Sequence, residues 1–327
     1  MTAHQGERHE TPPFHRSRHC RCQPVGCLSG FGRDRSGPRR LYRRFLGASA
    51  TAVATEQGLW EKHGLDADTK VFTNGPLQIQ ALGTNSLDFG YIGPGALWLP
   101  ASDKARVVAI SSVGNSDRIL AREGVTSLAD LKGKKVAVPE GTSGDMLLGL
   151  ALEAAGMSRD DLEIVTADPA TVVSAFASGQ VDGAAIWYPF VDVIRKANPG
   201  IVELAKNADF PQNQFPAAFV TNPATVTDRP ELVGKFIAVM KEAGDWRHAN
   251  PAETIKITAD FLGVDAAVLE QEATMGTSFT AEDLAAKSKD GTINSWLDGM
   301  AAIYVKQGKL EKALPAADYY TADLFVK

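Results

Sequence analysis

From residue 47 onward, short apolar runs alternate with segments in which apolar residues recur every three or four positions. The short runs predict strands and the periodic segments predict amphipathic helices. Strands are expected over 70–72, 87–92, 106–111, 135–138 and 163–166, and helices over 50–60, 76–82, 96–102, 145–155, 171–177, 230–246, 252–261, 281–287 and 293–307. Strands that alternate with helices of this length predict an α/β protein with parallel sheets.

One segment of the chain occurs twice. Residues 81–92 align without gaps on residues 175–186, and each copy has a helix end, a polar turn, an apolar–Asp pair and a strand of small residues. The first copy leads into Gly93-Pro94-Gly95 and the second into Trp187-Tyr188-Pro189. Two similar lobes would bring these loops to one edge, where open α/β sheets bind ligands. A common helix–turn–strand pattern that recurs by chance is the alternative.

Composition divides the 327-residue chain into two parts. Residues 1–44 contain 10 Arg, no Lys and 3 acidic residues, whereas residues 45–327 contain 24 basic and 36 acidic residues. The net charges of the two parts are therefore +7 and −12. The overall charge of −5 argues against a general nucleic-acid-binding protein, and no apolar run is long enough to span a membrane.

Residues 1–44 are predicted to be disordered, because they lack hydrophobic periodicity and are rich in Arg, Pro and Gly. They contain all three cysteines and four of the six histidines, but no second ligand pair at a spacing that suits zinc. No secretory signal is recognisable, because no apolar stretch precedes a small-residue cleavage site. The change from Arg to Lys usage near residue 45 suggests a segment that is not native to the fold.

Five segments resemble the solute-binding proteins of ABC importers, in particular the nitrate, sulfonate and taurine group. The resemblance rests on the order of the segments, because no single one is diagnostic. They are residues 57–65, 81–90, 127–139, 178–187 and 304–320. Together they extend the likeness over residues 48–327.

The resemblance implies an α/β fold of the two-lobed type II periplasmic binding protein kind, with parallel-rich sheets and a ligand cleft between the lobes. Residues 45–112 and 213–327 would form lobe I, and residues 113–212 would form lobe II. The lobes would close like a hinge on a small molecule. The family begins with an apolar strand before its first helix, whereas residues 36–44 are rich in Arg. Loss of that strand would leave backbone groups of its neighbours unpaired.

The backbone N–H groups at a helix N-terminus can hold an anion such as a sulfonate. Thr142, Ser143 and Gly144 open a predicted helix and fit this role, with ordinary helix capping as the alternative. The segment Gly93-Pro94-Gly95 precedes another predicted helix and could present amides in the same way, or form a plain turn.

Four further residues are candidates for ligand contacts. Asp145 in the first helical turn could hold the ammonium of a zwitterion such as taurine, or be a solvated charge. The resemblance implies an aromatic cover at Trp187 and Tyr188, for which core packing is the alternative. Asn115 follows the first crossover between the lobes and could donate a hydrogen bond to the ligand.

The resemblance implies an extracytoplasmic protein that captures a small sulfonate, a taurine-like zwitterion or an oxyanion and delivers it to an ABC importer. We expect a monomer in the periplasm or at the cell surface, with a membrane permease as partner and no cofactor. The resemblance leaves open a solute sensor, or an enzyme similar to the thiamine-pyrimidine synthases. Residues 28–327 have no Cys and only two His, which argues against the enzyme.

Overall fold

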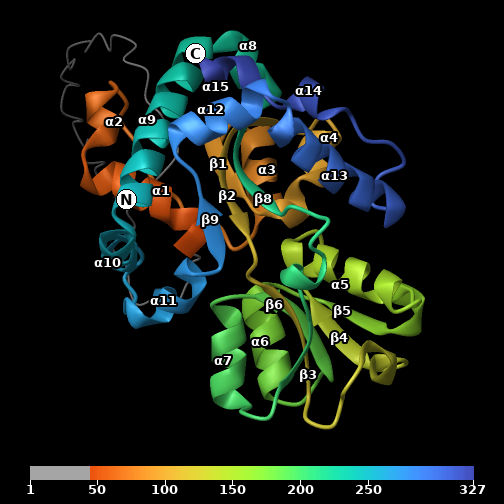
Figure 1. Ribbon diagram of the computed structural model, residues 1–327. Helices are drawn as coiled ribbons and strands as arrows, with labels where there is room; N and C mark the ends of the chain where they lie inside the picture. Colours follow the sequence, from red (N-terminus) through yellow and green to blue (C-terminus); the bar gives the residue numbers. More distant parts are fainter. Residues whose placement is uncertain (1–44) are drawn as a thin grey trace, which may run out of the picture.

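A computed structural model describes residues 45–327, so the predictions made for residues 1–44 lie outside the described part of the chain. The described residues form two sheets, which lie in two separate parts of the molecule (Figure 1). Their strands are β1 (Phe89–Ile92), β2 (Arg106–Gly114), β3 (Asp117–Ala121), β4 (Lys135–Val138), β5 (Glu163–Thr166), β6 (Gly183–Trp187), β7 (Val202–Lys206), β8 (Pro216–Thr221) and β9 (Gly276–Ser278).

Helices surround both sheets. The α-helices are α1 (Phe45–Glu56), α2 (Leu59–Lys62), α3 (Gly75–Gly83), α4 (Trp98–Ala101), α5 (Ser143–Ala154), α6 (Pro169–Ala177), α7 (Phe190–Ala197), α8 (Pro223–Asp228), α9 (Pro230–Ala249), α10 (Pro251–Leu262), α11 (Ala267–Ala273), α12 (Ala281–Lys289), α13 (Thr292–Lys306), α14 (Ala316–Tyr319) and α15 (Ala322–Val326). Short 3₁₀ turns are η1 (Pro94–Ala96), η2 (Leu128–Leu131), η3 (Arg159–Asp161) and η4 (Asn207–Asp209).

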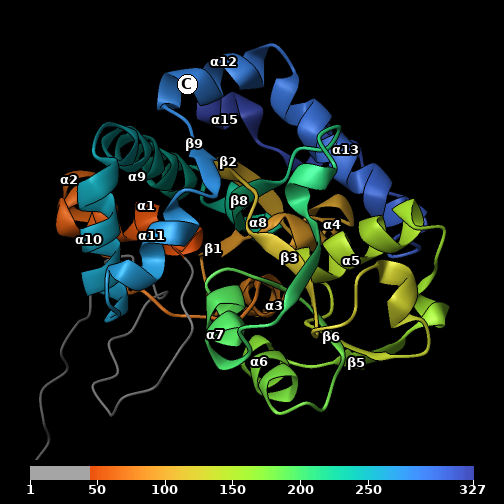
Figure 2. The same ribbon diagram turned by 60° about the horizontal axis from the view of Figure 1, so that its bottom comes forward.

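The first lobe is the sheet β1-β8-β2-β9 with the helices packed on it. Helices α1, α9 and α15 pack on β2, and α3 packs on β1. Figure 2 shows α1, α9 and α10 together on one side of β8, with α4 and α13 on the other side. The Phe89 ring of β1 stacks on Phe236 of α9, with 3.9 Å between ring centroids.

The second lobe is the sheet β5-β4-β6-β3-β7, and its strands carry apolar residues on both faces. Successive side chains of a strand point to opposite faces. Ala185 of β6 accordingly belongs to the same apolar cluster as α5, whereas Ala184 and Ile186 pack with α6 and α7. Burial on both faces explains why β6 and most of β4 are apolar.

The α/β fold is confirmed, but the expectation of parallel-rich sheets holds only for part of the second lobe. Strand β4 is parallel to β5 and β6, whereas every paired strand of the first sheet is antiparallel to its neighbour. The reason is that β8, which returns from the second lobe, lies between β1 and β2. A sequence pattern shows the order of strands along the chain and not which strands become neighbours.

The predicted bounds of β4 and β5 are confirmed to the residue, whereas the strand expected at 70–72 is wrong. That segment lines the same cavity as β1, and the Gln78 side chain of α3 pairs with the backbone of Tyr91 in β1. The N–H of Tyr91 donates to Oε1 of Gln78 at 2.8 Å, and the Gln78 amide donates back to the Tyr91 carbonyl. The side-chain amide of Gln78 thus satisfies backbone groups of Tyr91.

Two of the predicted helices are each divided into two shorter helices in the structure. Gly58, with φ of +64°, separates α1 from α2, because this backbone conformation ends a helix and favours glycine. The helix expected over 96–102 is two short pieces, η1 and α4.

The lobes are connected by β2, which leads into β3, and by the segment from β7 to β8. We propose the lobe boundaries predicted above, with residues 45–112 and 213–327 in one lobe and 113–212 in the other. This division is consistent with the sheets, since β3 to β7 all belong to the second sheet.

Candidate functional site

A cavity of about 170 Å³ lies between the two lobes. The first lobe contributes α1, the segment 69–75, β1 and the end of α10. The second lobe contributes the start of α5, the end of β6 and the start of α7. Parts of both lobes therefore enclose one space, as a ligand cleft between lobes requires.

Four of the predicted site residues line this cavity: Gly93, Thr142, Ser143 and Trp187. The Trp187 ring is buried and packs edge-on against Phe190, with 5.7 Å between ring centroids. The structure thus brings the ends of the two repeated segments and the start of α5 to one place.

Pro94, Gly95 and Gly144 do not line the cavity: Gly95 makes a close contact between the lobes, whereas Gly144 and Pro94 contact neighbours within their own lobe. A Cβ atom on Gly95 would lie 1.9 Å from the carbonyl carbon of Thr142, so η1 rests directly on the first peptide of α5. A Cβ atom on Gly144 would lie 2.6 Å from the carbonyl oxygen of Ala185. The Pro94 carbonyl accepts a hydrogen bond from the buried hydroxyl of Tyr304.

The hydroxyls of Thr142 and Ser143 already have protein partners. Thr142 Oγ1 donates to the carbonyl of Pro139 at 2.6 Å, and Ser143 Oγ donates to the buried carboxylate of Asp117. Asp117 therefore places negative charge close to the N-terminus of α5, where the helix dipole favours an anion.

Asp145 is also engaged and does not line the cavity. Its Oδ2 accepts from the N–H of Gly141 at 2.8 Å, and its Oδ1 forms an ion pair with Arg159. A ligand ammonium at Asp145 would have to replace these contacts.

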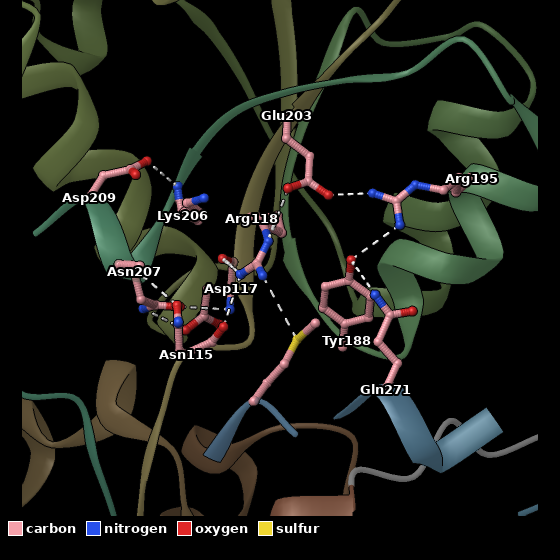
Figure 3. Close-up of polar contacts among 12 residues, drawn as sticks. Asn115, Asp117, Arg118, Tyr188, Arg195, Glu203, Lys206, Asn207, Asp209 and Gln271 are labelled. Atoms are coloured by element: carbon pink, nitrogen blue, oxygen red, sulfur yellow. Dashed lines mark hydrogen bonds and ion pairs between the residues drawn. The ribbon is translucent and has the colours of Figure 1, made fainter. Parts of the chain in front are cut away.

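Asn115 and Tyr188 lie at the connection between the lobes, away from the cavity lining (Figure 3). Asn115 Oδ1 accepts from the N–H of Ala208 at 3.1 Å. The Tyr188 ring lies beneath the Arg118 guanidinium, 5.2 Å from its centroid, and its hydroxyl accepts from Arg195 at 3.2 Å.

We call Asn115, Asp117, Arg118, Glu203 and Asn207 the crossover cluster (Figure 3). Arg118 forms an ion pair with Glu203 at 3.2 Å and donates to the carbonyl of Asn115 at 2.9 Å. Asn207 donates to the Asp117 carboxylate at 3.1 Å and accepts from the Asp117 N–H at 2.8 Å. The cluster thus satisfies its charges internally.

Sequence reasoning missed the segment 69–75, which lines the cavity with Lys70, Phe72 and Asn74 among its residues. The sequence pattern predicted a strand at 70–72 and therefore gave no indication that this segment lines the cavity. One signal was available, because Asn74 precedes Gly75 and Pro76, a typical helix start. Asn74 is indeed the N-cap of α3, and its Oδ1 accepts from the N–H of Leu77 at 3.0 Å.

The charge of the cavity lining is distinctive. Among the described residues, Lys70 is the only Lys or Arg that lines the cavity, and no Asp or Glu lines it. Outside the cavity lining, buried Arg247 donates to Ser49 and Ser111 and to no carboxylate of the described residues. Burial lowers the pKa of Arg247 to about 10, which leaves it positively charged at neutral pH.

Comparisons with known proteins agree with this architecture. The alkanesulfonate-binding protein SsuA from Xanthomonas axonopodis pv. citri bound to MOPS superposes with a TM-score of 0.65 at 24% identity, covering 84% of this chain and 95% of that chain. The described chain therefore has the fold of a periplasmic binding protein.

The NMT1/THI5-like family matches residues 48–254, and the chain belongs to this family. A relative from Brucella abortus (strain 2308), named as a binding protein, is 60% identical over 282 residues, which cover 86% of this chain and 88% of the relative. The taurine-binding periplasmic protein of Escherichia coli (strain K12) is 24% identical over 290 residues, with coverages of 86% and 90%. Between residues 45 and 327, none of the helices is long and apolar enough to cross a membrane.

Proposed function

We propose that the chain captures a small sulfonate, a taurine-like zwitterion or another oxyanion outside the cytoplasmic membrane and passes it to an ABC permease. The observation that carries this proposal is the cavity between the lobes, which has Lys70 at its rim and no lining carboxylate among the described residues. An anion in this space meets the favourable charge of Lys70. The sulfonate- and taurine-binding relatives support the same ligand class.

For the residues, we propose that Gly93, Thr142, Ser143 and Trp187 contact the ligand, together with Lys70. The remaining candidates do not contact the ligand but stabilise the structure of the lobes and their connection. Pro94, Gly95 and Gly144 allow close packing, and Asn115, Asp145 and Tyr188 hold the loops and the connection between the lobes in place.

A thermal-shift titration of the full chain against taurine, butanesulfonate, nitrate and sulfate tests the proposal. A ligand at about 1,000 times its dissociation constant adds about 4 kcal/mol to the free energy of unfolding, which raises the melting temperature by several degrees. We expect such a shift with at least one anion. A sharp melting transition that no anion shifts would contradict the proposal.

The Lys70→Met variant identifies the site. Loss of this charge is expected to weaken anion binding about tenfold, equivalent to about 1.4 kcal/mol. Lys104→Met is the matched control, because Lys104 is exposed and lies outside the cavity lining. Equal affinity of the two variants would exclude Lys70 from the site.

We propose a transport role rather than an enzyme, because the relatives described above are binding proteins. A solute sensor of the same fold would bind the same anion. Uptake of that anion by cells with and without the gene distinguishes the two, since only a transport protein is required for uptake.

A further inference from the structure

We propose that the preferred ligand is an anion with a single aromatic ring and no ammonium group, for example an arylsulfonate. This inference rests on the proposed function and narrows its ligand class. It derives from the wall, the charge and the size of the cavity between the lobes.

The wall is aromatic on both sides of the cleft. Phe72 and Phe261 come from the first lobe, and Trp187 and Phe190 come from the second lobe. Flat rings prefer offset-stacked or edge-to-face neighbours, and burial of an aromatic ring in such surroundings is favourable. A ligand with only a short aliphatic chain would leave much of this apolar surface uncovered.

The charges favour an anion without an ammonium group. The lining of the described chain offers no carboxylate to such a group, and nearby Asp145 already pairs with Arg159. Asp117 is buried and accepts hydrogen bonds from Ser143 and Asn207. A buried ammonium without a partner is costly. A taurine-like ligand would therefore meet a penalty that an arylsulfonate avoids.

The position of the polar groups sets the orientation of the ligand. Lys70 and Thr73 are exposed, and Asn74 is partly exposed, at the rim of the cavity. Phe89 and Phe219 are buried on its inner side. An amphipathic anion thus fits with its acid group at the rim and its ring inward.

The size of the cavity limits the ligand to about one ring. An apolar cavity of about 150 Å³ is known to hold benzene. The present cavity of about 170 Å³ accommodates a benzene ring with its acid group reaching the rim. Nitrate is much smaller than this space and would leave its apolar walls without contacts.

Isothermal titration calorimetry of the full chain with benzenesulfonate, butanesulfonate, taurine, nitrate and benzyl alcohol tests the inference. We expect benzenesulfonate to bind at least tenfold more tightly than butanesulfonate and at least 100-fold more tightly than taurine. Benzyl alcohol tests the charge, and equally tight binding of this neutral ring would overturn the inference. Tighter binding of taurine or nitrate would overturn it too, yet leave the proposed function intact. Failure of every anion to bind would contradict the proposed function itself.

Two variants test whether the aromatic rings of the cavity wall contact the ligand. Phe72→Ala and Phe261→Ala each remove a partly buried ring of the first-lobe wall and are expected to weaken benzenesulfonate binding about tenfold each. Phe279→Ala is the matched control, because this ring is also partly buried but lies outside the cavity and packs on Trp296. An equal loss of affinity in all three variants would contradict a ring pocket at this position.

Discussion

The cavity lies between the two lobes and the crossover cluster lies where the second lobe is connected to the first, and their chemistry is opposite. The cavity is lined by rings, with Lys70 at its rim and no carboxylate of the described chain. The crossover cluster has two carboxylates and an arginine that are paired with one another and with amides. The concentration of charge is therefore a poor guide to the ligand site, because paired charges can serve the connection between the lobes instead.

The neighbouring residues Trp187 and Tyr188 illustrate the difference. Trp187 ends β6 and lines the cavity, whereas Tyr188 lies under Arg118 at the crossover cluster. Successive residues at the end of a strand point in opposite directions. Two adjacent aromatic residues thus serve two different regions.

Three predictions test this comparison, and the largest effect concerns buried tyrosines of the first lobe that lie outside the cavity lining. Burial raises the pKa of Tyr304 and Tyr319 well above the ordinary value and raises the pKa of Tyr320 to about 12. Tyrosines of the unfolded chain ionise near pH 10, so stability present below pH 10 is lost as the pH rises toward 12. Each tyrosine contributes about 1.4 kcal/mol per pH unit, and the three together about 4. Urea unfolding at pH 9, 10, 11 and 12 measures the decline.

The control for the alkaline decline is Tyr320→Phe, which removes one ionisable hydroxyl and its 2.6 Å hydrogen bond with Ser288. The slope above pH 10 is expected to fall by about one third. A stability that stays constant between pH 10 and 12 would show that these hydroxyls are not held in apolar surroundings.

The next largest effect is expected at the contact between η1 and α5. Gly95→Ala places a methyl group 1.9 Å from the Thr142 backbone, which cannot move as a side chain can, so the lobes must separate. We expect a loss of about 2–3 kcal/mol in the free energy of unfolding and a larger radius of gyration in solution scattering. Gly234→Ala is the control, because its added methyl group meets no atom within 4 Å. An unchanged radius and stability for Gly95→Ala would refute the close contact.

A smaller effect is expected in the crossover cluster. Asp117→Ala removes the acceptor of the Ser143 hydroxyl and the Asn207 amide, at a cost of about 1–3 kcal/mol. Because Asp117 does not line the cavity, the order of ligand preference should be unchanged. Asp209→Ala is the control, since exposed Asp209 accepts from the Lys206 N–H without contacting the cluster. A reversal of ligand preference in Asp117→Ala alone would place this carboxylate in the binding site.

The sequence predicted those elements whose formation depends on local pattern. The apolar, β-branched runs of β4 and β5 lie where they were expected, because a short run of strand-favouring residues is a local property of the sequence. The segment 70–72 has a similar run but forms no strand, and the backbone of Tyr91 in β1 pairs with the Gln78 side chain. That pairing depends on the folded arrangement and leaves no local pattern.

The candidate site was predictable to a similar extent. Strand ends and a helix start correctly indicated Gly93, Thr142, Ser143 and Trp187 as neighbours in space. The alternation of side chains along a strand could have separated Tyr188 from them. The contact of Gly95 with α5 could not be foreseen, since it joins backbones from two lobes.

The most direct measurement is a crystal structure of the full chain with bound benzenesulfonate. We predict electron density for the sulfonate at the rim formed by Lys70 and Asn74, with the ring between Trp187 and Phe261. A sulfonate bound instead at Arg118 of the crossover cluster, with the cavity between the lobes unoccupied, would contradict the central claim.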